Sequence, residues 1–141
     1  MKVFIAQFMK AGDYSETRAL KRFSDLITLV QFGTGKFIVD KPAPEDIRAA
    51  REGLSRTRSI IAAGVHDLVI LEEANVAVKY GLFTARDLFD IIDTKPDHVE
   101  LVITGRYADP GIIERADLVT EMKDIKHYFN RGVDARVGIE K

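Results

Sequence analysis

The 141-residue sequence contains no cysteine and no tryptophan. The lack of cysteine excludes disulfide bonds and thiolate metal sites. No apolar run approaches the roughly 18 residues of a membrane span, and the first residues read as a strand rather than as a signal peptide. An excess of one charge is also missing, since 21 Lys and Arg residues face 22 Asp and Glu residues. That balance gives no general attraction to nucleic acid or anionic membrane, so we expect neither partner. Without a membrane span or a signal peptide, a cytoplasmic location is expected by default.

What the sequence does have is the composition of one ordinary domain over residues 1–141, with 46% hydrophobic and 30% charged residues. Apolar runs predict strands at residues 2–9, 27–32, 67–71, 98–104, 117–122 and 135–139. Helices are expected from a cap at Ser15, over 44–64, between Glu73 and Gly81, over 84–95 and over 109–116. This alternation predicts an α/β fold with a mostly parallel sheet, right-handed crossovers and helices on both faces.

The chain is organised around residues 67–81, where an apolar strand ends in the consecutive acids Glu72 and Glu73. Ligands of such sheets bind beyond the carboxyl ends of the strands. The segment therefore resembles a Walker-B element, in which one acid serves Mg²⁺ and the other orients or polarises a reactant. The alternative is a strand end that surfaces into solvated acids.

Other polar residues are expected at the same edge of the sheet. Gln7 and Lys10 end the first strand, Thr104-Gly105-Arg106 follows the strand at 98–104, and Thr120-Glu121 belongs to the strand at 117–122. Glycine permits close approach of a ligand, and arginine offers planar contact to phosphate. A tight turn with a surface arginine is the competing interpretation. Together these positions favour a nucleotide- or phosphate-type ligand without naming it.

The tetrapeptide Gly33-Thr34-Gly35-Lys36 is not a phosphate-binding P-loop. That motif needs a glycine five positions before Gly35, where Val30 stands, and a hydroxyl residue after the lysine, where Phe37 stands. We interpret the segment as a flexible turn.

Three stretches of the sequence resemble the ATP:corrinoid adenosyltransferase family. They are IAQFMKAG with Ser15-Glu16, VILEEANVAVKYGL at 69–82, and HVELVITGRYADPGIIERADLVTEMKDIKHYFNRGVDARVGIE at 98–140. The resemblance implies a three-layer, P-loop-NTPase-like (RecA-type) domain. It also implies transfer of the 5′-deoxyadenosyl group of ATP to Co(I) of a corrinoid, with Mg-ATP and corrinoid as the small molecules bound. Cobalt is the nucleophile, so the protein supplies positioning and electrostatics.

The same resemblance implies roles for individual residues. Glu73 and Arg106 match the catalytic acid and arginine, and Glu72 with Glu73 matches the Mg²⁺ site. The positions implied for binding ATP or corrinoid are Gln7, Lys10, Phe37, Asn75, Lys79, Thr104 and Gly105, with Tyr80 on the same helix as Lys79.

The sequence also departs from the family pattern. It has no Gly-rich Walker-A loop, and it reads as a form short of the family's first strand. The family's Asp is Glu72 here, Phe37 comes one position late, and the expected Trp is absent. We expect the strands at 98–104 and 117–122 to pair directly, or another chain to fill the slot between them, in a homodimer. The alternative function is a non-catalytic relative that acts as a corrinoid- or nucleotide-binding or assembly module.

Overall fold

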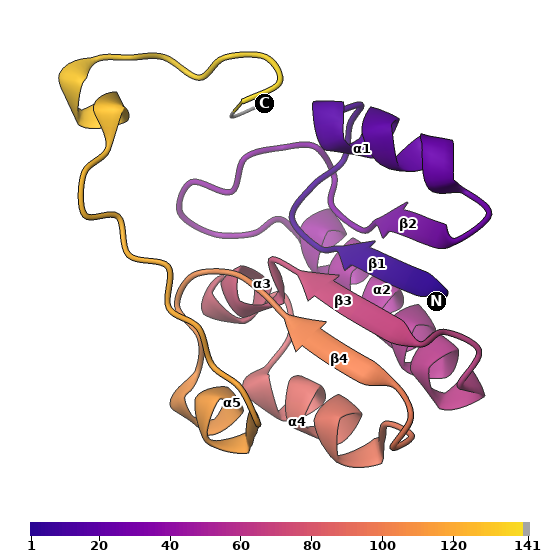
Figure 1. Cartoon of the computed structure of the whole chain (residues 1–141). Coiled ribbons are helices and arrows are strands. Elements are labelled where there is room, and N and C mark those ends of the chain that lie inside the picture. Colours follow the sequence, from indigo (N-terminus) through magenta and orange to yellow (C-terminus); the bar gives the residue numbers. More distant parts are fainter. Residues whose placement is uncertain (140–141) are drawn as a thin grey trace.

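The structure is a computed structural model that describes residues 1–139. Its centre is a four-stranded, all-parallel sheet in the order β2-β1-β3-β4 (Figure 1). The strands are β1 Val3–Gln7, β2 Ile27–Gln31, β3 Leu68–Glu72 and β4 Glu100–Ile103. The predicted fold class is confirmed, and so are the first four predicted strands.

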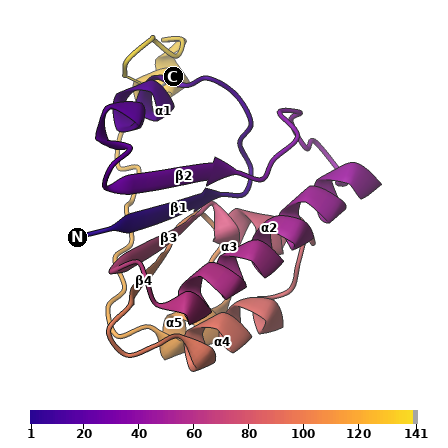
Figure 2. The same cartoon turned by 90° about the vertical axis from the view of Figure 1, so that its right-hand side faces the viewer.

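Helices connect the strands. They are α1 Ser15–Leu20, α2 Pro44–Ala63, α3 Ala74–Lys79, α4 Ala85–Thr94 and α5 Pro110–Arg115, with 3₁₀ turns η1 Lys21–Phe23 and η2 Tyr128–Arg131. The long helix α2 lies along one side of the sheet, and α1 lies on the other side next to β2 (Figure 2). Right-handed crossovers require this, because the step from β1 to β2 and the step from β2 to β3 run in opposite directions across the sheet. Within the described residues, no helix is long and apolar enough to cross a bilayer.

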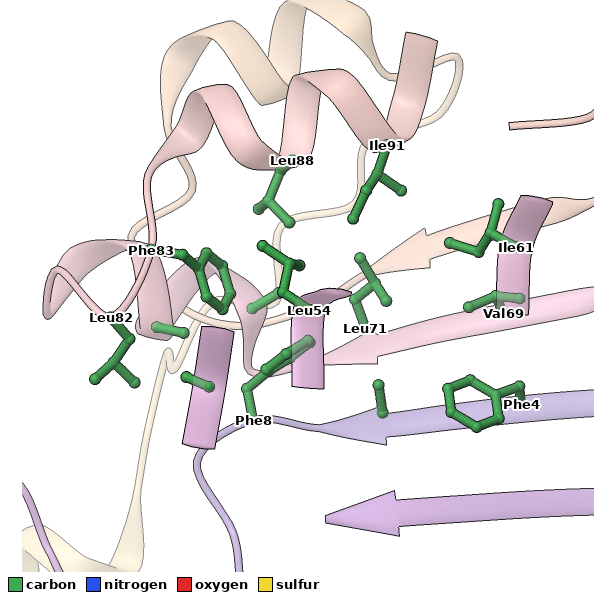
Figure 3. Close-up of a cluster of buried hydrophobic side chains, with 14 of the residues drawn as sticks. Phe4, Phe8, Leu54, Ile61, Val69, Leu71, Leu82, Phe83, Leu88 and Ile91 are labelled. Atoms are coloured by element: carbon green, nitrogen blue, oxygen red, sulfur yellow. The ribbon is translucent and has the colours of Figure 1, made fainter. Parts of the chain in front are cut away.

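The hydrophobic core fills the space between the sheet and helices α2, α3 and α4 (Figure 3). Alternate strand residues such as Phe4, Val69 and Leu71 face it and are fully buried. The opposite face of β1 and β3 is only partly buried, at Val3, Ile5, Leu68 and Ile70. Cover is therefore much heavier on one face of the sheet than on the other.

Side chains cap the starts of α4 and α5, and a glycine ends α2. Thr84 and Asp87 form a full capping box at the start of α4, and the Asp109 side chain accepts a hydrogen bond from the Gly111 amide. Gly64 ends α2 with a left-handed φ of 63°. The cap predicted at Ser15 is wrong: Tyr14 is the N-cap residue, without a side-chain bond, and Ser15 is the first residue of α1.

The predictions for the C-terminal segment are also wrong. Residues 117–122 form no strand and are exposed throughout, so Thr120 and Glu121 do not stand at a strand end. Residues 135–139 form no strand either and end in a turn. Over the described part of the chain β4 pairs with β3 alone, so direct pairing with 117–122 does not occur. The apolar pattern of 117–122 meets no neighbouring strand, and a strand cannot form by itself. Glu140, near the end of the family-like stretch, lies outside the described residues.

Candidate functional site

The carboxyl ends of three neighbouring strands carry a continuous chain of hydrogen bonds. Gln31, Gln7 and Glu72 are the last residues of β2, β1 and β3, and they stand in register. Gln31 Nε2 donates to Gln7 Oε1 at 3.0 Å, and Gln7 Nε2 donates to Glu72 Oε2. The Gly12 amide donates to Gln31 Oε1 at 2.9 Å. Because Gln7 is only 2% exposed, its amide must be satisfied inside the protein, and this chain does so.

Lys10 lies at the end of this series of hydrogen bonds, after Glu72, and its ammonium group stands between two carboxylates. Its Nζ donates to Glu72 Oε1 at 2.9 Å and to Glu16 Oε1 at 3.0 Å. Burial tends to lower the pKa of Lys10, but the hydrogen bonds and charges of Glu72 and Glu16 outweigh it, so the pKa is raised. Burial likewise tends to raise the pKa of Glu16, yet a backbone hydrogen bond and Lys10 lower it. The ammonium therefore stays charged at neutral pH.

A second group of contacts joins the end of β3 to the turn after β4. The Glu73 amide donates to Thr104 Oγ1 at 3.2 Å, and the Asn75 amide donates to the Thr104 carbonyl at 3.2 Å. Asn75 Nδ2 donates to the Gly105 carbonyl at 3.3 Å. Gly105 has φ 118°, and a Cβ there would lie 3.2 Å from Val76, so glycine is needed for this close approach.

Glu73 has an unusual backbone conformation at the centre of this junction. It is the N-cap residue of α3 with a left-handed φ of 59°, a region that non-glycine residues rarely occupy. Its carboxylate makes no hydrogen bond or ion pair with any of residues 1–139. Such strain is typical of functional positions, because the surrounding contacts must hold it in place.

Two cationic side chains lie next to the junction. Lys79 Nζ is 5.5 Å from the Tyr107 ring centroid, and Arg106 Cζ is 5.8 Å from it. Both cations are exposed, and Tyr107 itself has a left-handed φ of 66°. The structure thus gathers two positive charges around Tyr107, two residues after Gly105 of the junction. Tyr80, also expected near the site, directly follows α3 as its C-cap residue.

The predicted residue Phe37 does not join this site. Its side chain is 99% exposed on the loop between β2 and α2. The start of that loop lies against the loop after β1, because the Gly33 amide donates to the Lys10 carbonyl at 3.1 Å. A Cβ on Gly33 would lie only 2.7 Å from that carbonyl oxygen. Gly33 to Lys36 form a loop rather than a helix start, as predicted.

The donor set can be compared with what Mg²⁺ requires. Among the described residues, no group of three or more His, Cys, Asp or Glu side chains is arranged to hold a metal ion. Mg²⁺ usually keeps several waters and takes only one or two carboxylates together with substrate phosphates. The uncommitted carboxylate of Glu73 fits that role, whereas both oxygens of Glu72 are already bonded.

Sequence reasoning missed two members of the site. Gln31 fell within the strand predicted at 27–32, and Glu16 was named only within a stretch that resembles the family. The signal for Gln31 was available, because it is the polar last residue of a strand, as Gln7 is. Glu16 could not be placed, because the spatial approach of α1 to Lys10 depends on the intervening loop.

The fold and the site together define a P-loop-NTPase-like α/β protein with acidic and basic groups at the carboxyl ends of its strands. A model of the family described as ATP:corrinoid adenosyltransferase BtuR/CobO/CobP matches residues 1–140. The chain belongs to this family.

Curated relatives agree with that assignment. The chain is 34% identical over 141 residues to a corrinoid adenosyltransferase of Pseudomonas aeruginosa, covering 99% of the chain and 70% of the relative. It is 31% identical to one from a Sinorhizobium species, covering 99% and 67%. A corrinoid adenosyltransferase of Escherichia coli is 32% identical over 95 residues, which is 67% of this chain and 48% of that protein.

Proposed function

We propose that this chain acts in the transfer of the 5′-deoxyadenosyl group of ATP to Co(I) of a corrinoid, in cobalamin biosynthesis or salvage. In this reaction cobalt attacks C5′, the new Co–C bond forms, the C5′–O bond breaks, and triphosphate leaves. The observation that carries the proposal is the junction of Glu73 with the Thr104-Gly105-Arg106 turn, in a chain that belongs to this family.

The cations near the junction would contact the triphosphate. Arg106 and Lys79 are exposed cations beside the junction, and a guanidinium can contact phosphate oxygens bidentately. Asn75 supports them indirectly, because it holds the Gly105 carbonyl and keeps its own Oδ1 buried without a partner among the described residues. That free acceptor suits an N–H or O–H group of a ligand.

Mg²⁺ would be held by Glu73 together with the phosphates. Bound there, the ion would neutralise charge that develops on the leaving triphosphate. Thr104 accepts a hydrogen bond from the backbone amide of Glu73 and so helps to hold the Glu73 backbone at the end of β3.

We further propose that the working form is a homodimer or a complex with a partner chain that adds a strand beside β4. Within residues 1–139, β4 has only one strand neighbour, and buried parallel sheets are normally flanked and covered on both sides. The segment after α5 also exposes several large apolar side chains: Leu118, Val119, Met122, Ile125 and Phe129. Surfaces of this kind are typical of interfaces. A cytoplasmic location remains a prediction.

The second candidate function is a non-catalytic relative that binds corrinoid or nucleotide, or serves in assembly. The observation that favours it is that the turn Gly33 to Lys36 does not have the G-x-x-x-x-G-K-[ST] spacing of a phosphate-binding loop. That loop normally supplies much of the affinity for the phosphates.

An adenosyl-transfer assay decides between the two. The purified chain is mixed with Mg-ATP and chemically reduced corrinoid, and formation of the Co–C bond is followed by its absorbance change. Glu73→Gln and Arg106→Ala are compared with Glu52→Gln and Arg56→Ala, exposed residues of α2 that make no polar contact with other described residues.

The proposed activity predicts turnover that falls by roughly a hundredfold in both site variants and stays unchanged in both controls, since single electrostatic groups contribute on that scale. No turnover in a folded protein that still binds corrinoid or ATP would establish the non-catalytic alternative. Equal activity in all four variants would place the reaction elsewhere.

A further inference from the structure

The two acids at the end of β3, Glu72 and Glu73, differ in how many hydrogen bonds their carboxylates make. Both oxygens of Glu72 are bonded, Oε2 to the amide of Gln7 and Oε1 to the ammonium of Lys10. The Glu73 carboxylate has no such partner among the described residues. A metal ion at Glu72 would have to displace a buried amide or an ammonium, whereas at Glu73 it would displace only water.

The partners of Glu72 are themselves fixed. Gln7 is 2% exposed and is held from its other side by Gln31, which in turn accepts from the Gly12 amide. Replacing Gln31 by an apolar residue would leave the buried Oε1 of Gln7 without its partner, which is costly. The hydrogen bonds from Gln31 through Gln7, called the relay below, therefore set the position of the Glu72 carboxylate. Glu72 in turn sets the position of Lys10.

The length of Glu72 is part of this arrangement. An aspartate would hold its carboxylate one methylene closer to the backbone of β3. It could then not keep both contacts without a shift of β1 or of the loop that carries Lys10. Glu72 in place of the expected Asp is thus consistent with a side chain that contacts Gln7 and Lys10 across the ends of neighbouring strands.

Lys10 keeps one donor for a ligand. An ammonium group has three N–H donors, and Glu72 and Glu16 take two of them. The side chain is 30% exposed, so the third donor can meet an anion at the edge of the sheet. The charge of Lys10 is preorganised rather than free to swing, which lowers the entropic cost of binding.

We propose that Glu72 is not a metal ligand but the positioning residue of Lys10, and that the Lys10 ammonium binds an oxygen of the triphosphate. Gln7 and Gln31 fix Glu72 for this role, and Glu73 alone of the two acids serves Mg²⁺. The triphosphate part of this inference rests on the proposed function, whereas the Glu72–Lys10 pairing does not.

The test uses the full chain and five variants: Glu72→Gln, Lys10→Met, the double variant of these two, Glu73→Gln and Gln31→Met. Binding of inorganic triphosphate is measured by calorimetry without Mg²⁺, and ATP binding is measured over a range of Mg²⁺ concentrations. Two readouts need no ligand. One is the coupling free energy between Glu72 and Lys10, obtained from urea unfolding of the two single variants and the double variant. The other is hydrogen exchange of the Gln7 side-chain amide, measured by NMR. Gln31→Met tests the relay one step away, should Glu72→Gln fail to fold.

Lys10→Met and Glu72→Gln should each weaken triphosphate binding by roughly tenfold, and the double variant by no more than either alone, because the pair acts as a unit. The Mg²⁺ concentration for half-maximal ATP binding should stay constant in Glu72→Gln and rise in Glu73→Gln. Gln31→Met should weaken triphosphate binding in the same direction but less.

The proposal is overturned if Glu72→Gln raises the Mg²⁺ requirement as Glu73→Gln does, or if the effects of Lys10→Met and Glu72→Gln simply add. Failure of the wild type to bind any triphosphate would refute the proposed function and the ligand assigned to Lys10. In that case the unfolding coupling and the Gln7 exchange still decide whether Glu72 positions Lys10.

Discussion

Replacement of Gly53 by alanine is the sharpest test of how α2 supports the site. Gly53 is buried in the middle of α2, and a Cβ built there would lie 2.2 Å from Cγ and 2.7 Å from Cβ of Phe32. These atoms lie at the base of the Phe32 side chain, so a change of rotamer at the ring tip cannot relieve the overlap. Phe32 directly follows Gln31, and its ring packs against Phe8 with centroids 5.8 Å apart.

Two effects of the substitution oppose each other. Alanine favours a helix interior over glycine by about 1 kcal/mol. Inserting a methyl group into a packed contact typically costs about 1–3 kcal/mol. Because the overlap with Phe32 is severe, we expect the clash to prevail and Gly53→Ala to lower the free energy of unfolding by about 1–2 kcal/mol.

The assay is urea unfolding followed by far-UV circular dichroism. Glu52→Ala is the matched control, since it changes the neighbouring, exposed position of the same helix and should be neutral or slightly stabilising. If Gly53→Ala were as stable as the wild type or more stable, the close packing of Phe32 on α2 would be refuted. The position of the β2 end, and with it Gln31, would then need revision.

Three further predictions concern the rest of the chain. A hydrogen bond from Thr84 outweighs the effect of burial and lowers the pKa of Asp87. Ionised Asp87 therefore stabilises the folded state above the unfolded pKa of about 4, and this stabilisation is lost as pH falls through the folded pKa. Asp87→Asn should thus cost about 1 kcal/mol at pH 7 in thermal or urea unfolding, and the difference from wild type should shrink below pH 4; a constant difference would exclude this linkage. Gly105→Ala should lower stability by about 1–2 kcal/mol, because φ is 118° and Val76 lies 3.2 Å from the new Cβ; an unchanged urea midpoint would contradict the tight junction. Brief trypsin treatment should cut first within residues 117–139, as mass spectrometry would show, and first cuts within α2 would contradict the exposed state of that segment.

The sequence was sufficient to predict the elements whose signals are local. The strand at 67–71 and the helix from Pro44 to Gly64 were found because apolar periodicity, a proline near the start and a glycine at the end all agree. The helix expected over 84–95 was found as well, as α4 from Ala85 to Thr94. Each of these features depends on residues within a few positions of one another.

The C-terminal segment shows what local patterns cannot predict. Residues 117–122 have the composition of a strand, but a strand exists only when a neighbour supplies its hydrogen bonds, and none of the described residues does. The apolar pattern indicates that these side chains favour burial, but it does not predict which segment would cover them.

The site was predictable in part. Register follows from the parallel sheet, so Gln7 and Glu72 could be expected at one edge. Which oxygen of Glu72 each partner takes, and the left-handed backbone of Glu73, depend on three-dimensional contacts with Lys10 and Thr104. Phe37 was placed by resemblance alone, and its side chain is 99% exposed although the start of its loop contacts Lys10.

Calorimetric titration with Mg-ATP tests the central claim most directly, namely that the junction of Glu73 with the turn at Arg106 binds the triphosphate of ATP. The wild type is compared with Glu73→Ala, Arg106→Ala and the control Arg56→Ala. We predict saturable binding by the wild type and the control, with binding at least tenfold weaker in both site variants. Binding that is equal in all four proteins, or absent from the folded wild type, would contradict the claim.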